Sequence, residues 1–396
     1  MGEDNVRKIY TEVFGTAVQV FICQDRRPII YTRDTYMMKY GIITHYDVHN
    51  HGALLQLNGL KQVLNSLGIE ANALQFDKNY DLMGRALKAK YNISIKSIGV
   101  YLKFLSERGI QSTLFNYKKS KLLNRFRKEQ SLIGPYYTEC GELDGVVVGS
   151  DEVFALHTGP TPALFGHALP SSKVFSYGGC FGPTTIEDVD KLHCRAFVAS
   201  GLSSMCGLGM RDQNSIDIAA ELTGKQPELV CDPVILYGYE NEIDNKQRPI
   251  KEPYMVVYAY DNQFDDQSKT ITEYARRNNF KIVSPGFIQK WADINANIDP
   301  FELLTWFKHA ECVVTNTFHG CVLSIITGRE MAVRMRGNAN KLYNLLQEYR
   351  ITDRVFGENN SLDDVFSHNV DWTLVEEQIK SRRAASMDYL KRMIEK

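Results

Sequence analysis

The sequence predicts an α/β protein built from two Rossmann-like domains. Its 396 residues exceed what one ordinary hydrophobic core supports, so two domains are the default. Short apolar, β-branched runs alternate with helical patterns along most of the chain, which is typical of parallel sheets made of βαβ units. Several runs end in polar, glycine-bearing loops, where open α/β sheets bind ligands. We therefore expect a ligand cleft between the two domains.

The composition excludes several classes of protein. With 44% apolar residues, 23% charged residues and a net charge of −1, the chain is typical of a globular protein and lacks the strong positive charge of a general nucleic-acid binder. Its cysteines form no CxxC pair, which favours reduced, buried thiols in the cytoplasm over disulfides or a zinc site. Four of them lie in apolar runs: Cys194, Cys231, Cys312 and Cys321. No run approaches roughly 18 apolar residues, so we expect neither a membrane-spanning helix nor a signal peptide.

Residues 1–37 differ in pattern from the rest of the chain and are interpreted as an N-terminal extension. They mix charges with aromatic residues, and residues 18–22 and 29–32 have the composition of strands. These patterns fit an added hairpin as well as an incorrectly assigned start.

The first Rossmann-like domain, residues 38–238, opens with a βαβ unit. We expect its first strand, helix and second strand at residues 39–44, 53–68 and 69–76. Three histidines and an aspartate lie in the loop before the helix: His45, Asp47, His49 and His51. Such a group fits a metal site. Histidines at loop–helix junctions more often bind substrate or lie in solvent, however, and no further acidic or histidine partner is nearby, so we assign no metal.

A basic helical insertion comes next, at about residues 78–135. Its lysines and arginines are interleaved with leucines and aromatic residues. The pattern favours a solvated helical insertion. The alternative is a surface that contacts anionic lipid headgroups or a lipid-linked pyrophosphate.

The rest of the first domain continues the alternation. We expect a helix at 216–224 and strands at 145–149, 173–177, 195–200, 204–209 and 228–231. Asp151 follows the first of these strands, at the strand end where α/β sheets bind ligands. Arg211 lies between a strand and a helix start, where a guanidinium can bind a carboxylate or phosphate with two hydrogen bonds. A structural ion pair with Asp212 explains Arg211 as well.

The second Rossmann-like domain, residues 254–370, comes after a charged, proline-bearing linker at 239–253. We expect strands at 254–260, 281–284, 312–314 and 331–335, and helices at 268–277, 300–309 and 339–348. The final segment, 371–396, carries a long helix predicted to pack back across both domains.

Residues 311–328 carry the strongest local signal. A buried strand is followed by a polar turn, then by His319 and a helix that ends at Gly328, a natural C-cap. A helix N-terminus exposes unpaired N–H groups and attracts anions. A histidine there either binds a phosphate or carboxylate, donates a proton, or merely caps the helix.

Six motifs in this order resemble the polysaccharide pyruvyl transferase family, whose members are similar to two-domain, GT-B-like glycosyltransferases. The motifs are Asn50-His51-Gly52-Ala53-Leu54-Leu55-Gln56, Gly149-Ser150-Asp151, Ser176-Tyr177 to Gly182, Arg211-Asp212, Asp232-Pro233 and Thr315-Asn316-Thr317-Phe318-His319-Gly320. The resemblance covers roughly residues 38–356.

The resemblance implies a reaction and its partners. The family moves the enolpyruvyl unit of phosphoenolpyruvate, a co-substrate, onto a sugar or lipid-linked oligosaccharide. This gives a pyruvate ketal and phosphate during exopolysaccharide or capsule assembly, with no cofactor or metal. The expected location is the cytoplasm, extending to the inner face of the membrane. Two alternatives stay open: a nucleotide-sugar-dependent GT-B glycosyltransferase, and a non-catalytic member of an assembly complex.

The resemblance also implies roles for individual residues. His319 is the candidate for phosphate binding and proton donation, Arg211 would clamp phosphate or carboxylate, and Asp151 would orient or deprotonate an acceptor hydroxyl. The expected substrate-binding residues are Asn50, His51, Gly52, Ser150, Tyr177, Asn316, Thr317, Arg336 and Lys341.

Two positions depart from the family pattern. Several members carry an arginine two residues before the histidine, where this chain has Thr317. The donor site thus loses one expected cation, for which Arg334, Arg336 or Lys341 can substitute. After Gly-Ser-Asp, the usual Gln-x-Trp is replaced by Glu152-Val153-Phe154, which alters the expected acceptor side.

Overall fold

The structure is a computed structural model that describes residues 8–13, 16–21, 29–32, 37–77, 97–158, 160–244, 246–335 and 340–396. The chain forms two compact units, Met1–Met38 and Lys39–Lys396. In the first unit, three antiparallel strands pair in the order β1-β2-β3: Lys8–Val13, Thr16–Phe21 and Ile29–Thr32. The strands expected at 18–22 and 29–32 correspond to β2 and β3, whereas the sequence pattern did not predict β1.

The first sheet of the large unit has seven strands in the order β10-β9-β8-β7-β4-β5-β6, and its recorded ladders are parallel. The strands are β4 Met38–Ile43, β5 Ile69–Gln75, β6 Ile133–Tyr136, β7 Gly145–Val148, β8 Val174–Gly179, β9 Leu208–Met210 and β10 Glu228–Leu229. Its helices are α1 His51–Ser66, α2 Ser97–Glu129, α3 Ile186–Lys191, α4 Arg195–Ser204, α5 Gln213–Thr223, α6 Pro233–Tyr237 and α7 Glu240–Asp244.

The second sheet has six parallel strands in the order β13-β12-β11-β14-β15-β16. The strands are β11 Tyr254–Tyr258, β12 Lys281–Pro285, β13 Ile294–Ala296, β14 Cys312–Thr315, β15 Met331–Arg334 and β16 Val355–Phe356. Its helices are α8 Ser268–Arg277, α9 Pro300–Lys308, α10 Phe318–Thr327, α11 Asn340–Glu348 and α12 Leu362–Phe366, followed by the C-terminal α13 Trp372–Glu395.

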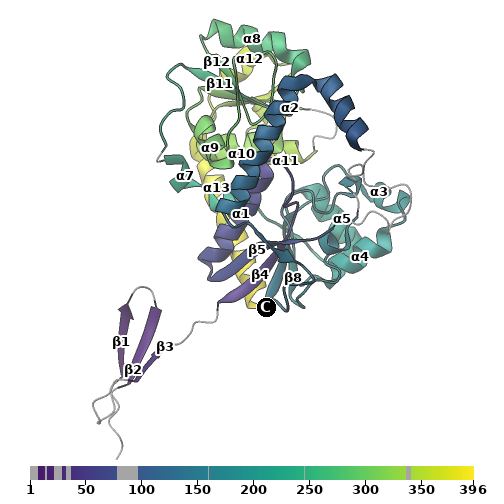
Figure 1. The fold of residues 1–396 in the computed structure, drawn as a ribbon, viewed down its shortest axis with the longest axis vertical. Helices are drawn as coiled ribbons and strands as arrows, with labels where there is room; N and C mark the ends of the chain where they lie inside the picture. Colours follow the sequence, from purple (N-terminus) through teal and green to yellow (C-terminus); the bar gives the residue numbers. More distant parts are fainter. Residues whose placement is uncertain are drawn as a thin grey trace, which may run out of the picture. The chain divides into compact units, whose positions relative to one another are not determined.

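These two sheets confirm the predicted fold class of two Rossmann-like α/β domains (Figure 1). The central strands are buried along their whole length, as in β7 and β14, because helices cover both faces of a parallel sheet. That is why they stand out in the sequence as continuous β-branched runs. The predicted bounds of the domains and of the linker at 239–253 stay predictions, although α7 forms inside that linker.

One predicted strand is wrong. Residues 195–200 belong to helix α4, which runs from Arg195 to Ser204. Val198, Gly201 and Leu202 are its buried residues, at the spacing of one helix face. A short apolar run does not distinguish a strand from a buried helix. The strand expected at 204–209 is confirmed only in part, because Ser204 is the last residue of α4 and β9 spans Leu208–Met210.

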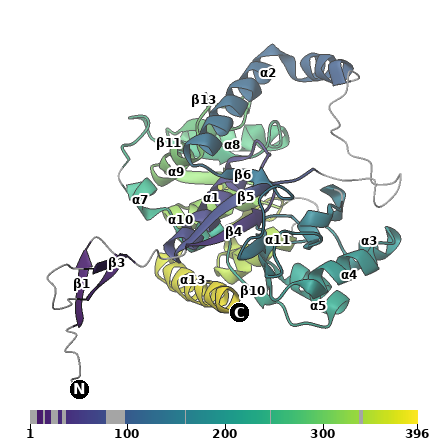
Figure 2. The same cartoon turned by 60° about the horizontal axis from the view of Figure 1, so that its bottom comes forward.

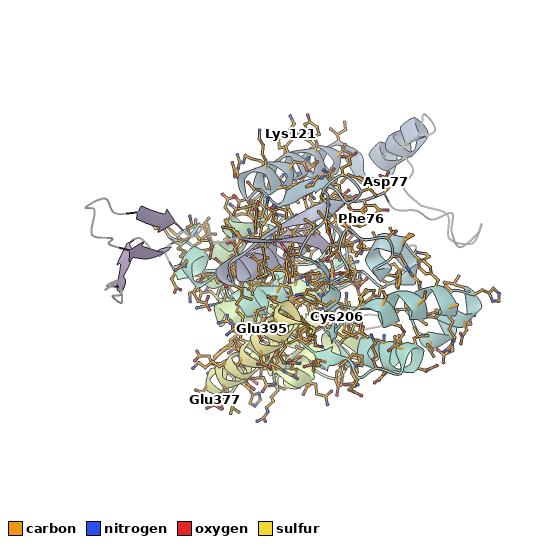
Figure 3. The ribbon with its side chains drawn as sticks, turned by 90° about the horizontal axis from the view of Figure 1, so that it is seen from below. Phe76, Asp77, Lys121, Cys206, Glu377 and Glu395 are labelled. Atoms are coloured by element: carbon orange, nitrogen blue, oxygen red, sulfur yellow. The ribbon has the colours of Figure 1, made fainter. Side chains whose placement is uncertain are left out.

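Helix α2 packs across both domains. The predicted insertion is helical from Ser97 to Glu129 with a kink at Gly109, where φ is 80°. Its last predicted residues, 133–135, instead begin strand β6, and residues 78–96 lie outside the described part of the chain. From α2, Phe126 packs edge-on against Phe301 of α9 at 4.9 Å, and Lys119 Nζ lies 4.0 Å from the centre of the Phe287 ring. One face of this helix is thus buried on the second domain (Figure 2), while Lys121 points outward (Figure 3). The described part of the insertion is therefore only partly solvated.

Helix α13 connects the first sheet with the second domain. Tyr389 donates a hydrogen bond to the backbone oxygen of Ser176 in β8 at 2.8 Å, and Cys231 N donates to Ser386 Oγ at 2.9 Å. Arg382 of the same helix pairs with Glu348 of α11 at 2.6 Å. The last helix thus joins the first sheet to a helix of the second domain.

Candidate active site

Two strand–loop–helix junctions, one from each domain, meet at the carboxyl ends of the sheets. In the first domain, Asn50 caps α1 by accepting a hydrogen bond from Ala53 N at 3.2 Å. In the second, Thr317 caps α10 by accepting from Gly320 N at 2.9 Å. Polar caps of this kind satisfy the free N–H groups of a first helical turn. A cavity of about 340 Å³ lies where the two junctions face each other.

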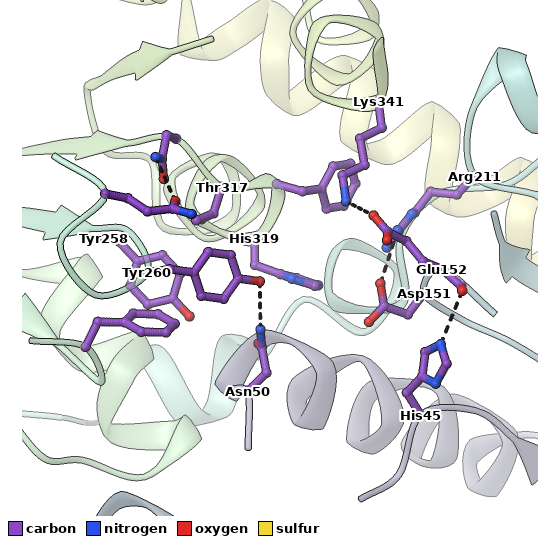
Figure 4. Close-up of a pocket in the computed structure, with 14 residues that line it drawn as sticks. His45, Asn50, Asp151, Glu152, Arg211, Tyr258, Tyr260, Thr317, His319 and Lys341 are labelled. Carbon is purple, nitrogen blue, oxygen red and sulfur yellow. Dashed lines mark hydrogen bonds and ion pairs between the residues drawn. The ribbon is translucent and has the colours of Figure 1, made fainter. Parts of the chain in front are cut away.

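Both domains line the cavity, which agrees with the predicted cleft (Figure 4). The first domain contributes His45, Asn50, Asp151, Glu152 and Arg211. The second contributes Tyr258, Tyr260, Gln263, Phe287, Asn316, Thr317, Phe318, His319 and Lys341.

His319 lies in the first turn of α10 with its ring against Gly52 of α1. A Cβ atom at Gly52 would overlap the imidazole, so only glycine permits this approach. The Nε2 atom of His319 is buried and has no hydrogen-bond partner among the described residues. Burial lowers the pKa of His319 from its ordinary value, against the opposing effect of Asp232 and Asp151. The imidazole is therefore neutral at about pH 7.

The guanidinium of Arg211 is held by carboxylates and by an aromatic ring. Its Nη1 donates to Asp232 at 3.0 Å and its Nη2 to Asp151 at 3.4 Å, and its Cζ lies 4.3 Å from the centre of the Phe318 ring. Burial disfavours the charge, but neighbouring Cys180, Asp232 and Asp151 outweigh it and raise the pKa of Arg211 well above its ordinary value. Arg211 is therefore a fixed, permanently charged group.

Asp151 occupies a special backbone position three residues after the end of β7. Its φ of 80° lies in the left-handed region, which is uncommon for residues other than glycine. Burial raises the pKa of Asp151, but Arg211, His319 and His45 outweigh this effect and hold the pKa well below its ordinary value. The carboxylate stays ionised, so it accepts hydrogen bonds readily and is a weak base.

An ion pair between Lys341 of α11 and Glu152 of the first domain crosses the cavity. The two side chains are 31% and 21% exposed. Burial lowers the pKa of Lys341, but Glu152 outweighs this and raises it above its ordinary value. Among the residues that line the described cavity, both permanent cations, Arg211 and Lys341, are thus already paired with carboxylates.

Most of the residues assigned from the sequence come together here. Those that line the cavity are Asn50, Asp151, Arg211, Asn316, Thr317, His319 and Lys341. Gly52 lies against His319 instead of at the cavity wall. Arg336 lies outside the described residues.

Three assigned residues do not line the cavity because they belong to the core. His51 is fully buried and its Nε2 donates to the backbone oxygen of Ile298 at 2.9 Å. Tyr177 is fully buried and donates to the backbone oxygen of Cys231 at 3.0 Å. Ser150 is buried beside Thr44, which donates to its backbone oxygen at 2.8 Å. His51 and Ser150 each lie beside a residue that reaches the cavity, Asn50 and Asp151, and the sequence does not reveal which member of each pair faces it.

The histidines of the first loop diverge instead of forming a metal site. His45 reaches the cavity, His49 contacts Ser120 of α2 at 3.1 Å, and His51 enters the domain interface. No group of three or more metal-ligating side chains occurs within the described ranges.

Sequence reasoning missed the aromatic residues of the cavity, Tyr258, Tyr260 and Phe287. The signal was present, because Tyr258 and Tyr260 lie at the end of the predicted strand at 254–260. The rule that places ligands at strand ends applies to them as it does to Asp151. Phe287 follows β12 by two residues.

The fold and the cavity define a class of protein: a two-domain, GT-B-like α/β chain with its ligand site between the domains. The family model of polysaccharide pyruvyl transferase matches residues 50–333. The chain therefore belongs to the polysaccharide pyruvyl transferase family, a family of transferases.

Comparison with solved structures returns chains of similar length at low identity. MnaA of S. aureus with UDP has 12% identity and a TM-score of 0.47, over 89% of this chain and 90% of that one. UDP-GlcNAc 2-epimerase from Neisseria meningitidis bound to UDP-GlcNAc has 10% identity and a TM-score of 0.45, over 90% and 99%. The glycosyltransferase SnogD from Streptomyces nogalater has 12% identity and a TM-score of 0.42, over 90% and 99%. Scores this low carry no argument about substrate, and the fold class rests on the sheet topology.

No curated protein sequence matches the chain. Within the described residues, none of the helices combines the length and apolar character needed to cross a membrane. The cysteines of this part of the chain are free thiols. The four that lie in apolar runs are buried: Cys194, Cys231, Cys312 and Cys321.

Proposed function

We propose that this chain transfers the enolpyruvyl group of phosphoenolpyruvate to a sugar or lipid-linked oligosaccharide during surface-polysaccharide assembly. The observation that supports the proposal is the convergence of His319, Arg211, Asp151 and Lys341 on one cavity in a chain of this family. These groups are far apart in the sequence, and each suits one step of the reaction.

In the proposed reaction, one acceptor hydroxyl adds to C2 of phosphoenolpyruvate while C3 gains a proton. The C2–O bond to phosphate then breaks, and a second hydroxyl adds to C2 and closes the ketal. The acceptor loses two protons. One ends on C3 and the other on the departing phosphate, so charge and atoms balance without a cofactor or metal.

The residues have matching roles in this proposal. His319, whose Nε2 has no partner in the described part of the chain, binds the phosphate, takes up a proton as the anion binds, and supplies this proton to the donor. Asp151, held ionised, orients the acceptor hydroxyl by accepting its hydrogen bond. Arg211 stabilises the charge that develops at the donor.

Donor binding requires Lys341 to exchange Glu152 for the phosphate. A partly exposed ion pair contributes only about 0–1 kcal/mol, so this exchange is easy. The buried pair between Arg211 and Asp232, at 3.0 Å, is different, because breaking a buried pair costs about 3–5 kcal/mol. Lys341 is therefore the proposed substitute for the arginine that Thr317 replaces.

The test is release of phosphate from phosphoenolpyruvate in the presence of a panel of glycan acceptors. We expect release that depends on the acceptor and is lost in Lys341→Ala. Unchanged phosphoenolpyruvate across the panel, together with thermal stabilisation by UDP or GDP, would instead support a nucleotide-sugar glycosyltransferase. Full biological function in both Lys341→Ala and His319→Ala would support a non-catalytic member.

A peripheral position at the membrane is part of the same proposal. The outward face of α2 exposes Ile110, Leu114 and Tyr117, at 76%, 51% and 57%, beside the exposed Lys118 and Lys121. Apolar and basic side chains on one helix face suit an anionic lipid surface. Sedimentation with vesicles of phosphatidylglycerol should retain the protein at low salt, and Lys118→Glu with Lys121→Glu should abolish it. Equal retention of both proteins would remove this part of the proposal.

A further inference from the structure

The cavity has two chemically different ends. Arg211, Asp151, Glu152 and Lys341 gather at one end, Tyr258 and Tyr260 at the other, and His319 lies between them (Figure 4). The charged residues pair with each other. The lining residues around the tyrosines are uncharged: Asn50, Gln263, Phe287, Asn316 and Thr317. The second end is therefore built for a neutral ligand.

The aromatic residues of this end form a fixed corner. Phe287 packs edge-on against Tyr258, with ring centres 5.2 Å apart, and against Tyr260 at 5.1 Å. Lys119 of α2 covers the Phe287 ring with its ammonium group at 4.0 Å. The hydroxyl of Tyr260 accepts a hydrogen bond from Asn50 Nδ2 at 3.2 Å. Tyr260 is thus held at its ring edge and at its hydroxyl.

Tyr260 nevertheless stays 47% exposed. A large aromatic ring that is held in place and left accessible inside a cavity is a platform on which a flat apolar surface can stack. A pyranose ring offers such a surface on its C–H face, with hydroxyl groups around its rim.

Two polar atoms at the same end are buried without a partner among the described residues. They are the hydroxyl of Tyr258 and the Oδ1 atom of Asn316, whose Nδ2 donates to Gln263 at 3.0 Å. Leaving a buried polar group unpaired is unfavourable, and buried polar groups in folded proteins generally have a partner. Ligand hydroxyls fit both atoms because a hydroxyl donates and accepts.

We propose that Tyr260, Tyr258 and Asn316 form the subsite for a pyranose ring of the acceptor. The C–H face of the sugar stacks on Tyr260, and its hydroxyls bond to Tyr258 and Asn316. This inference rests on the proposed function for the role of the sugar as acceptor. A pyranose bound here lies on the opposite side of His319 from Lys341 and Arg211, so that its hydroxyls face a donor held at the charged end. A nucleoside diphosphate fits less well, because it would place its phosphates among uncharged side chains.

The test measures sugar binding directly by saturation-transfer NMR. The probes are the methyl pyranosides of glucose, galactose, mannose and their 2-acetamido derivatives, with phosphoenolpyruvate present. In the wild-type protein we expect saturation of the ring C–H protons of at least one pyranoside. In Tyr260→Ala the affinity should fall about tenfold, since the variant loses both the stacking contact and the apolar area that the ring buries against the sugar.

Two further variants separate stacking from general damage. Tyr260→Leu keeps an apolar side chain without a ring, so it should fold even where Tyr260→Ala does not. It should still lose pyranoside binding. Tyr343→Ala removes a tyrosine that is similarly exposed, at 48%, and is absent from the cavity wall. It should bind the pyranoside as the wild type does.

The inference is overturned if no pyranoside in the panel binds, if UDP binds at Tyr260 in its place, or if both Tyr260 variants bind as the wild type does. Calorimetry with phosphoenolpyruvate alone measures donor binding without a sugar. It therefore separates failure of the sugar subsite from failure of the proposed function. Pyranoside binding that depends on Tyr260 without any turnover of phosphoenolpyruvate keeps the subsite and removes the reaction. Phosphate release with an unchanged acceptor KM in both Tyr260 variants keeps the reaction and removes the subsite.

Discussion

His51 and His319 occupy equivalent places in the two domains and have different environments. Each lies in the first turn of the helix after a buried strand, in α1 and α10. Each ring also packs against a glycine of the other domain, because a Cβ atom at Gly286 would overlap His51 and one at Gly52 would overlap His319. His51 donates to the backbone oxygen of Ile298 at 2.9 Å, whereas His319 lines the cavity and its Nε2 has no partner in the described part of the chain.

This difference teaches that a histidine at a strand–loop–helix junction acquires its role from the opposite domain. The second domain covers His51, whereas the first domain leaves His319 accessible to a ligand. One histidine therefore holds the domains together, and the other remains available for chemistry. Substitutions at each histidine and at the glycine beside His319 test this division.

The largest expected effect belongs to His319→Ala. Loss of a general acid typically lowers the rate by about 10²–10⁴-fold, and the partly buried side chain makes no hydrogen bond to any other residue that the structure describes. We expect kcat/KM for phosphoenolpyruvate to fall by that factor at an unchanged Tm. His368→Ala, which alters an exposed histidine, is the control. Wild-type activity in His319→Ala would remove this residue from the mechanism.

Gly52→Ala tests whether the position of His319 matters. Alanine favours a helix over glycine by about 1 kcal/mol, so α1 itself gains stability. The added Cβ atom nevertheless displaces the imidazole. A displacement of about 1 Å at a reacting group costs about 10²-fold in rate. Steady-state kinetics should show this loss in kcat more than in KM. An unaffected kcat would mean that the ring adapts without consequence.

His51→Gln should weaken the dependence of the free energy of unfolding on pH and leave phosphoenolpyruvate affinity unchanged. Burial, with a smaller effect of Lys119, lowers the pKa of His51 to about 3. The folded state therefore holds His51 neutral, and its contribution to stability is present above about pH 6.5 and is lost as the pH falls toward 3. Glutamine keeps a donor for Ile298 but does not titrate.

Between about pH 6.5 and 4.5, the free energy of unfolding of the wild type should therefore fall by roughly 2–3 kcal/mol more than that of His51→Gln. Urea denaturation at several pH values measures the difference. Parallel pH profiles of the two proteins would show that the buried imidazole does not control acid stability.

The smallest expected effect is proton uptake on donor binding. Burial keeps the pKa of His319 below its ordinary value, and a bound phosphate raises it, so binding at about pH 7 should take up as much as about one proton per site. Calorimetry with phosphoenolpyruvate in two buffers of different ionisation enthalpy measures this number. His319→Ala should abolish the uptake and His51→Gln should keep it. Uptake that persists without His319 would assign the proton to another group.

Much of the fold could be predicted from the sequence because parallel strands are local, continuous apolar runs. The strand at 312–314 and the helix at 268–277 lie where β14 and α8 are found. Residues 195–200 are an exception because a short apolar run fits both a strand and a buried helix, and the short strands β13 and β16 were not predicted. The buried face of α2 could not be predicted, since it depends on Phe287 and Phe301 in the other domain.

For the candidate site, the sequence by itself determined which chemical groups are available and which strand ends carry them. Asp151, Arg211 and His319 follow buried strands, and that position alone directs them to one edge of a sheet. Only the tertiary structure decided that His319 faces the cavity while His51 is covered, and that Tyr260 joins the site from the other domain. The physical reason is that burial and hydrogen-bond partners are set by contacts between segments about 200 or more residues apart, for which a local pattern carries no signal.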